Sequence, residues 1–111
     1  MLCVINLEDG LPKVYEAIDT LDVELTLAKE RKEDCALIIH GYGKRTQGGG
    51  KIKEAARKRL SELKNLGKIK DCVFGENMSH FDERVMRLKY KHNELDEYVG
   101  KRNLGVTLVI L

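Results

Sequence analysis

Aromatic side chains are scarce in this sequence of 111 residues: they make up 5% of it, and tryptophan is absent. Domains of the RRM class bind single-stranded RNA by stacking its bases on aromatic side chains of their strands. A sequence so poor in aromatic residues does not favour that mode of recognition. Contacts to a phosphate backbone, or to the shape of a nucleic acid, need no such side chains.

The cysteines do not form the pairs that a disulfide framework or a zinc site needs. There are three of them, an odd number, and no CxxC spacing joins any two. Cys3, Cys35 and Cys72 each lie at the edge of an apolar run, where a thiol behaves as a small hydrophobic side chain. We therefore expect buried, reduced cysteines, as in a reducing compartment.

No apolar run approaches the roughly 18–20 residues that a membrane-spanning helix needs. The opening segment MLCVINLEDG has no basic part and reaches its first acidic residue at Glu8, unlike a signal peptide. With 42% hydrophobic and 34% charged residues, the composition is that of a globular chain. We expect a single domain over residues 1–111, a cytoplasmic location and no membrane partner.

The charge is distributed unevenly, although the net charge is only +2. Residues 44–70 contain 10 basic and 2 acidic residues, a net charge of +8. Residues 1–43 contain 4 basic and 9 acidic residues, a net charge of −5. A solvated helix face would normally interleave acids for pairing along the helix. The imbalance instead favours a polyanionic partner such as DNA or RNA.

Hydrophobic periodicity predicts alternating strands and helices in the order βαβαβ(α)β. The run CALIIH is apolar throughout, which is typical of a central strand covered on both faces. Ser79 is the expected N-cap of the last helix, whose apolar face would include Phe81, Val85 and Leu88. The order implies an α/β fold of βαβ units with a parallel or mixed sheet. We expect strands at 2–7, 35–40, 69–74 and 105–111, and helices from 12 to about 31, from 52 to 66 and from 79 to 91.

The segment HGYGKRTQGGGKIK, residues 40–53, joins a strand to a helix and has the properties of a phosphate site. A helix N-terminus presents unpaired N–H groups and the positive end of a helix dipole to an anion. Glycines allow the backbone to approach that anion closely. The segment is not a Walker A loop, because Ile52 follows Gly50-Lys51 where Ser or Thr is required. It does not match the GxGxxG spacing of a dinucleotide fold either.

These residues resemble the signature of the Smr (small MutS-related) domain, HGxGxG followed by Leu-Arg and a basic helix. His40, Gly41 and Gly43 match the first part, and Ile52-Lys53 stand in place of Leu-Arg. The closing segment NLGVTLVIL is similar to the family's last strand, with Gly105 and Thr107 matching. The resemblance covers nearly the whole chain. It implies a compact two-layer α/β sandwich similar to the C-terminal domain of translation initiation factor three.

The resemblance also implies a link to nuclease activity, but the opening motif departs from the family. Where the family has LDLHGL, this chain has INLEDGL. Aligned by strand register, Asn6 and Glu8 stand in place of the family's Asp-x-His pair, and aligned by the glycine, Leu7 and Asp9 do, so neither alignment gives Asp-x-His. A nuclease needs a base or metal ligands beside the scissile phosphate. His40, Glu8 and Asp9 are the candidate catalytic residues, and the carboxylates could bind Mg²⁺ or Mn²⁺. Binding alone would require no cofactor.

Individual residues in the segment allow two interpretations. His40 either contacts phosphate as a donor or general acid, or hydrogen-bonds the loop and fixes its shape. Tyr42 either stacks on a base or packs over the bend. Lys53 and Arg57 share a helix face and are the preferred phosphate contacts on it. The predicted nucleic-acid-binding residues are His40, Gly41, Tyr42, Gly43, Lys44, Arg45, Gly49, Gly50, Lys51, Lys53 and Arg57.

The leading hypothesis is therefore a domain that binds DNA or RNA through its phosphate backbone. A metal-assisted DNA-nicking or RNA-cleaving endonuclease is the alternative from the enzyme class. A third hypothesis is an interaction module that docks on the ribosome, with ribosomal RNA as the polyanion.

Overall fold

The computed structural model describes residues 1–42 and 50–111, which contain a four-stranded mixed sheet. The strands are β1 (Val4–Asn6), β2 (Cys35–Ile39), β3 (Asp71–Phe74) and β4 (Val106–Ile110). Their order across the sheet is β1-β2-β4-β3, with β1 parallel to β2 and β4 antiparallel to both of its neighbours. The four predicted strands are thus confirmed, with ends trimmed by one or two residues.

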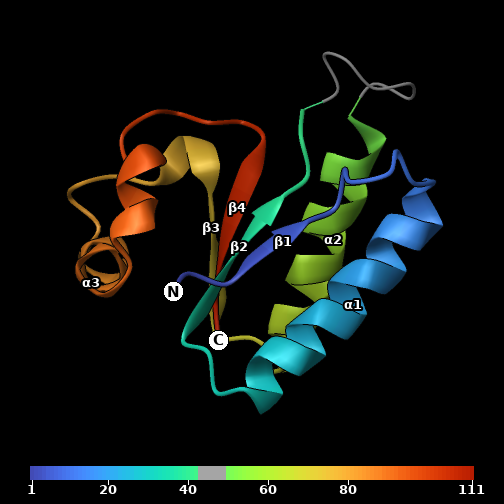
Figure 1. Cartoon of the computed structure of the whole chain (residues 1–111), viewed down its shortest axis with the longest axis horizontal. Helices are drawn as coiled ribbons and strands as arrows, with labels where there is room; N and C mark the ends of the chain where they lie inside the picture. Colours follow the sequence, from blue (N-terminus) through green and yellow to red (C-terminus); the bar gives the residue numbers. More distant parts are fainter. Residues whose placement is uncertain (43–49) are drawn as a thin grey trace.

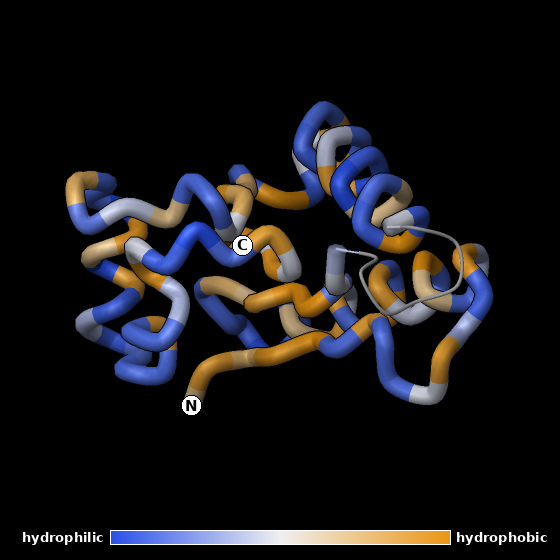
Figure 2. The backbone as a smooth tube through the Cα atoms, turned by 90° about the horizontal axis from the view of Figure 1, so that it is seen from above, coloured by the Kyte–Doolittle hydropathy of each residue, from blue (hydrophilic) through white to orange (hydrophobic). Residues whose placement is uncertain are grey.

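One face of the sheet is covered by α1 (Val14–Glu30) and α2 (Lys51–Asn65), which lie side by side (Figure 1). Ala36 and Ile38 of β2 point to this side and pack with Leu21 and Leu25 of α1. Both helices carry apolar residues at intervals of three and four, so each presents one buried stripe to the sheet. Figure 2 shows the result as orange central strands between helices that alternate blue and orange.

The opposite face of the sheet is covered by α3 (Glu83–Lys91) and two short 3₁₀ helices, η1 (Gly75–Asn77) and η2 (Asn93–Glu97). Cys35 and Leu37 of β2 point to this side and pack with Val85 and Leu88 of α3. Successive strand residues point to opposite faces, so the unbroken apolar run of β2 feeds two separate cores. The prediction of two layers is therefore wrong: the sheet is the middle of three.

The start of α3 also differs from the prediction. The carboxylate of Asp82 accepts hydrogen bonds from the N–H groups of Arg84 and Val85, so Asp82 is the N-cap. Ser79 instead closes a turn by accepting from the N–H of Phe81. Phe81, which we placed on the apolar face, is 96% exposed because it precedes the helix.

The cysteines are free thiols. Cys35 is buried, whereas Cys3 and Cys72 are half-buried at the margin of the core. Burial raises the pKa of Cys35 to about 12, so its thiol is protonated at neutral pH. Of the helices in the described ranges, none has the length and apolar character to cross a bilayer.

Candidate functional site

The chain leaves β2 in a turn that is anchored to the loop before β4. The N–H groups of His40 and Gly41 both donate to the carbonyl of Gly105, each across 3.0 Å. A Cβ built on Gly105 would lie 3.3 Å from the ring of Tyr42, so the aromatic side chain packs over this glycine. Glycine at 105 therefore lets the turn and the loop approach each other closely.

The imidazole of His40 is only 3% exposed, and both ring nitrogens have partners. Nδ1 lies 2.7 Å from the carbonyl oxygen of Gly41, and Nε2 lies 2.9 Å from the hydroxyl of Thr107. Because a carbonyl can only accept, Nδ1 carries the proton and the Thr107 hydroxyl donates to Nε2. Burial lowers the pKa of His40 to about 4, so the ring is neutral at pH 7.

Arg57 of α2 donates to the same Thr107 hydroxyl that contacts His40. Its Nε–H donates to the Thr107 hydroxyl across 3.2 Å, and its terminal nitrogens form a two-point ion pair with Glu76 at 2.9 and 2.7 Å. The guanidinium also lies 3.9 Å from the ring centroid of Phe74. The hydrogen bonds from Arg57 lower the pKa of Glu76 to about 2, so the pair stays charged at neutral pH.

Two predicted site residues are therefore engaged inside the protein. Of the two interpretations of His40, the geometry favours the one in which a neutral imidazole fixes the loop. Arg57 was a predicted phosphate contact, yet its donors are directed to Thr107, Glu76 and the carbonyl of Val106. Both residues are better described as positioning residues than as groups that meet a ligand directly.

One of the two candidate carboxylates lies at the turn. Gly41 has a φ of +69°, and a Cβ built there would collide with the carboxyl group of Glu8. The Glu8 side chain thus rests against the bare Cα of Gly41, next to His40. Asp9 is exposed in the turn after β1. Of the candidate catalytic acids, the structure brings Glu8 alone to the His40–Gly41 turn.

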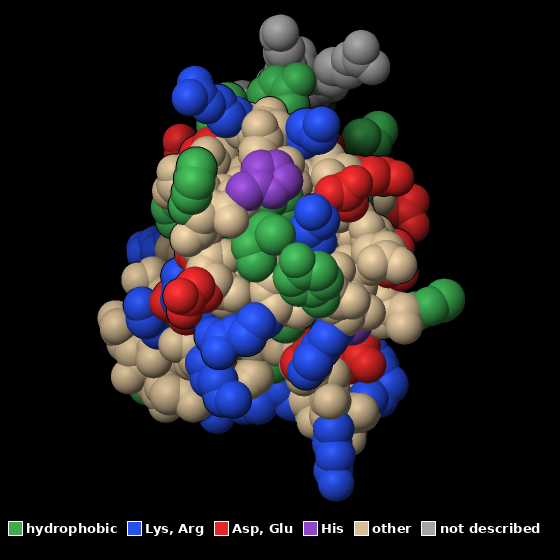
Figure 3. Space-filling view, turned by 90° about the vertical axis from the view of Figure 1, so that its left-hand side faces the viewer, with side chains coloured by type: hydrophobic (Ala, Val, Ile, Leu, Met, Phe, Trp, Pro, Cys, Tyr) green, Lys and Arg blue, Asp and Glu red, His purple; other side chains and the backbone are tan. Residues whose placement is uncertain are grey.

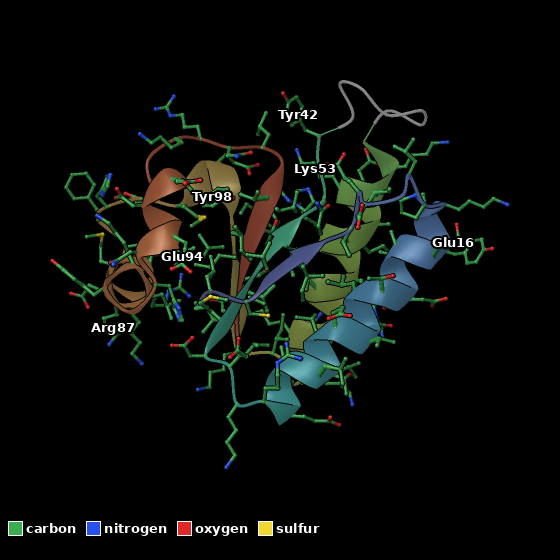
Figure 4. The ribbon with its side chains drawn as sticks, in the orientation of Figure 1. Glu16, Tyr42, Lys53, Arg87, Glu94 and Tyr98 are labelled. Carbon is green, nitrogen blue, oxygen red and sulfur yellow. The ribbon has the colours of Figure 1, made fainter. Side chains whose placement is uncertain are left out.

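The N-terminus of α2 is the other side of the site. Gly50 precedes the helix with a φ of 83°, and it has no side chain that could cap the first N–H groups. Lys51 is exposed, and Lys53 is half-buried and close enough to His40 to help lower the pKa of that imidazole. Figure 4 shows Tyr42 and Lys53 at the same end of the sheet. The predicted contacts Gly43, Lys44, Arg45 and Gly49 lie outside the described residues.

The charge count suggested that the cations of α2 form one free basic face, but the structure shows that several of them are paired with acids. Besides Arg57 with Glu76, Arg59 pairs with Asp22 of α1 at 2.9 Å, and Lys64 pairs with Asp71 of β3 at 2.9 Å. Acids from other elements of the fold therefore neutralise cations in the middle and the C-terminal part of the helix. Across residues 1–42 and 50–111, the ion pairs involve neither Lys51 nor Lys53.

A group of possible metal ligands lies at the other end of β2, away from the turn. Donor atoms of Asp34, Cys35 and His92 lie within 4.8 Å of one another. His92 donates to Asp34 across 2.8 Å, the ammonium of Lys91 lies 3.5 Å from the same carboxylate, and Cys35 holds its proton. These contacts make a charge cluster that ties α3 to β2. Within the described ranges the His40 turn has no comparable group of three ligands.

Sequence reasoning missed the network that supports the turn. Thr107 and Gly105 were noted only for their match to a closing strand, and Glu76 was not singled out. Glu76 lies 19 positions from Arg57, and Thr107 lies 67 positions from His40, so no local spacing connects them. The only signal was chemical: a buried histidine and a buried threonine each need a hydrogen-bond partner.

A model of the Smr domain matches residues 10–76, which is more than half of the chain. The match includes the His40 turn and all of α2, and it begins after Glu8 and Asp9. No curated protein and no solved structure matches the chain.

Proposed function

Because this chain belongs to the Smr domain family, which is linked to nucleic-acid binding and nuclease activity, we propose that it binds DNA or RNA at the His40 turn. The phosphate backbone is held by the first N–H groups of α2 and by the side chains of Lys51 and Lys53. Tyr42, which is 51% exposed, lies beside the same phosphates. The predicted contacts between 43 and 49 belong to the same proposal.

The observation that carries this proposal is the state of the α2 N-terminus. Among the described residues, no side chain caps the start of α2, and such a helix start presents N–H groups and the positive end of the helix dipole to an anion. Lys51 and Lys53 lie on the first turn of α2. The acids that neutralise cations of this helix pair with Arg57, Arg59 and Lys64, which lie farther along it. The buried chain from Arg57 through Thr107 to His40 holds His40 and Gly41 in place, so this part of the site needs little ordering on binding.

Charge reversal at the helix start tests this proposal. Binding of a fluorescent oligonucleotide is measured by anisotropy for the wild-type chain and for Lys51→Glu with Lys53→Glu. The double variant is expected to lose at least tenfold in affinity and to reduce the dependence of log K on log salt by about two. A control, Lys32→Glu with Lys68→Glu, changes the net charge equally at exposed residues at the far ends of α1 and α2. Equal losses in both variants would reject the site.

Metal-assisted cleavage is a second candidate, and the position of Glu8 favours it. Its carboxylate lies against Gly41, where it would face a phosphate held by the turn. A hard cation such as Mg²⁺ or Mn²⁺ accepts carboxylate oxygen, and phosphate oxygens would supply further ligands. Glu8→Gln should abolish nicking of supercoiled plasmid and cleavage of structured RNA while oligonucleotide affinity is retained. Cleavage that survives Glu8→Gln would reject this carboxylate as the metal ligand.

A further inference from the structure

A hollow of about 670 Å³ opens at the end of the sheet opposite the His40 turn. Leu88 of α3 and Ile110 of β4 contribute apolar surface to it, and Tyr90, whose side chain is 81% exposed, stands at its side. Lysine and arginine side chains contribute the rest of the rim together with two acids. The volume is in the range of sites that bind small organic groups.

Positive charge is in excess at this hollow. Asp71 is paired with Lys64 and Arg84, and Asp34 pairs with the ammonium of Lys91 and accepts a hydrogen bond from His92. Both acids are therefore already neutralised by neighbours. Lys70 and Arg87 are the rim cations that remain: both are exposed, and across the described part of the chain the ion pairs involve neither of them.

The figures place this excess on one side of the molecule. Figure 3 looks at the side on which α3 lies, and lysine and arginine side chains gather over the lower part of that surface. In Figure 4, Arg87 points away from the ribbon at the opposite end from Tyr42 and Lys53. The charge count of the sequence did not indicate the part of this patch that α3 supplies, because residues 71–111 carry 6 basic and 7 acidic residues.

The hollow combines apolar and aromatic surface with exposed cations, and this combination indicates which kind of ligand fits it. A phosphate ion alone would use only the cations of the rim. An aromatic base can stack on the ring of Tyr90 and cover Leu88, while the phosphate next to it in the chain meets Lys70 or Arg87. A single-stranded polynucleotide offers both groups at once, whereas in a duplex the base faces are covered by their neighbours.

A groove extends from the hollow toward the His40 turn and ends at Arg57, which holds Thr107 at the base of that turn. It has a volume of about 390 Å³, follows the outer edge of β3, shares Asp71 and Arg84 with the hollow, and reaches Arg57 below the turn. Its cations are balanced by acids, so it neither attracts nor repels phosphate strongly. The six residue-to-residue steps from Asp34 to His40, along β2, span about 20 Å. A strand whose nucleotides are spaced as in a duplex, about 3.4 Å apart along the axis, covers this distance with roughly six nucleotides, and a more extended strand covers it with fewer.

We propose that the hollow beside α3 is a second contact site for a single-stranded nucleic acid whose other end lies at the His40 turn. One base stacks on Tyr90 over Leu88, and the flanking phosphates meet Lys70 and Arg87. The inference rests on the proposed function and adds to it a preference for single strands and a minimum length.

The test compares oligothymidylate and oligouridylate of 4 and 16 nucleotides by fluorescence anisotropy. The 4-mer reaches one site, whereas the 16-mer reaches both. Lys70→Glu with Arg87→Glu should lower the affinity of the 16-mer at least tenfold and remove most of its advantage over the 4-mer. The charge-matched control Lys32→Glu with Lys68→Glu should leave that advantage in place. If the two double variants behave alike, the hollow is not a contact site.

Tyr90 separates stacking from charge. Tyr90→Ala should weaken 16-mer binding about fivefold or more, and Tyr90→Phe, which keeps the ring, should not. Neither variant should change the affinity of a 16-base-pair duplex. An equal loss for duplex and single strand would overturn the stacked base. The side chain is exposed, so both variants should fold normally.

The outcome for the turn is read separately. If Lys51→Glu with Lys53→Glu weakens binding and the hollow variants do not, the second site is wrong and the proposed function stands. If only the hollow variants weaken binding, the nucleic acid binds beside α3 and the turn is not its site. A wild-type chain that binds none of these oligonucleotides would overturn both.

Discussion

The Nε–H of Arg57 donates to the hydroxyl of Thr107 across 3.2 Å, which links the middle of α2 to β4 at the base of the His40 turn. The Thr107 hydroxyl in turn donates a hydrogen bond to Nε2 of His40, and the Nδ1–H of His40 donates to the carbonyl of Gly41. The donors thus run in one direction from the helix to the backbone of the turn. The shape of a surface turn depends on this buried chain, and the variants below interrupt it at different points.

Thr107→Val should destabilise the fold by about 1–3 kcal/mol, because it leaves the Nε2 of His40 and the Nε–H of Arg57 without their shared partner in a buried place. Valine has nearly the same shape as threonine, so packing changes little. Thr107→Ser keeps the hydroxyl and should cost less. Urea unfolding of the three chains measures the difference. Equal stability for the valine and serine variants would show that the hydroxyl is not needed.

The Arg57–Glu76 pair should behave as a coupled unit. Arg57→Met and Glu76→Gln should each lower the free energy of unfolding by about 2–3 kcal/mol, since each leaves a partly buried charge without its partner. The double variant should cost less than the sum of the two by about 1–2 kcal/mol. Urea unfolding of all four chains completes the cycle. Strictly additive losses would mean that the ion pair contributes nothing of its own.

The fold was more predictable from the sequence than the site was. Short apolar runs identified the strands, and intervals of three to four residues identified the helices, because both patterns are local properties of the chain. The apolar run of β2 indicated a strand that is buried on both faces, but the prediction of two layers did not include helices on the second face. Phe81 misled the α3 assignment because its spacing from Val85 fits a helix, while the Asp82 cap starts the helix after it.

The site depended on pairings between residues distant in the sequence. The charge count correctly drew attention to residues 44–70, but a count cannot show that Asp22, Asp71 and Glu76 fold onto that helix. The same count grouped Lys70 with the rest of residues 44–70, and it hid Arg87, because residues 71–111 contain 6 basic and 7 acidic residues. Net charge along the chain is a poor guide to charge on a surface when strands and helices bring distant segments together.

Gly41 should tolerate no side chain, for two separable reasons. Its positive φ would cost an alanine about 1–2 kcal/mol, and the Cβ would also collide with Glu8. Gly10 has a φ of +79° with nothing within 4 Å, so Gly10→Ala measures the backbone cost alone. Gly41→Ala should therefore lower the melting temperature more than Gly10→Ala. Adding Glu8→Ala to Gly41→Ala should recover the difference, and no recovery would place the strain elsewhere.

His40 should make stability depend on pH in a defined window. Its pKa is about 4 in the folded chain against 6.5 unfolded, so between these values the unfolded state binds a proton that the folded state does not. Stability is therefore complete above about pH 6.5 and falls as the pH decreases toward 4, with a slope of up to about 1.4 kcal/mol per pH unit.

Urea unfolding between about pH 7 and pH 5 isolates this effect, because the paired carboxylates of Asp71 and Glu76 lose their contributions only at lower pH. His40→Gln keeps a hydrogen-bonding side chain but cannot take up the proton, so its profile in this window should be flatter than that of the wild-type chain. His80→Gln removes an exposed imidazole and should leave the slope attributable to His40 in place. If His40→Gln retains the full slope, the imidazole already binds its proton in the folded chain. The one-way order of donors from Arg57 to Gly41 would then not hold at the lower end of this pH window, because a protonated ring cannot accept from Thr107.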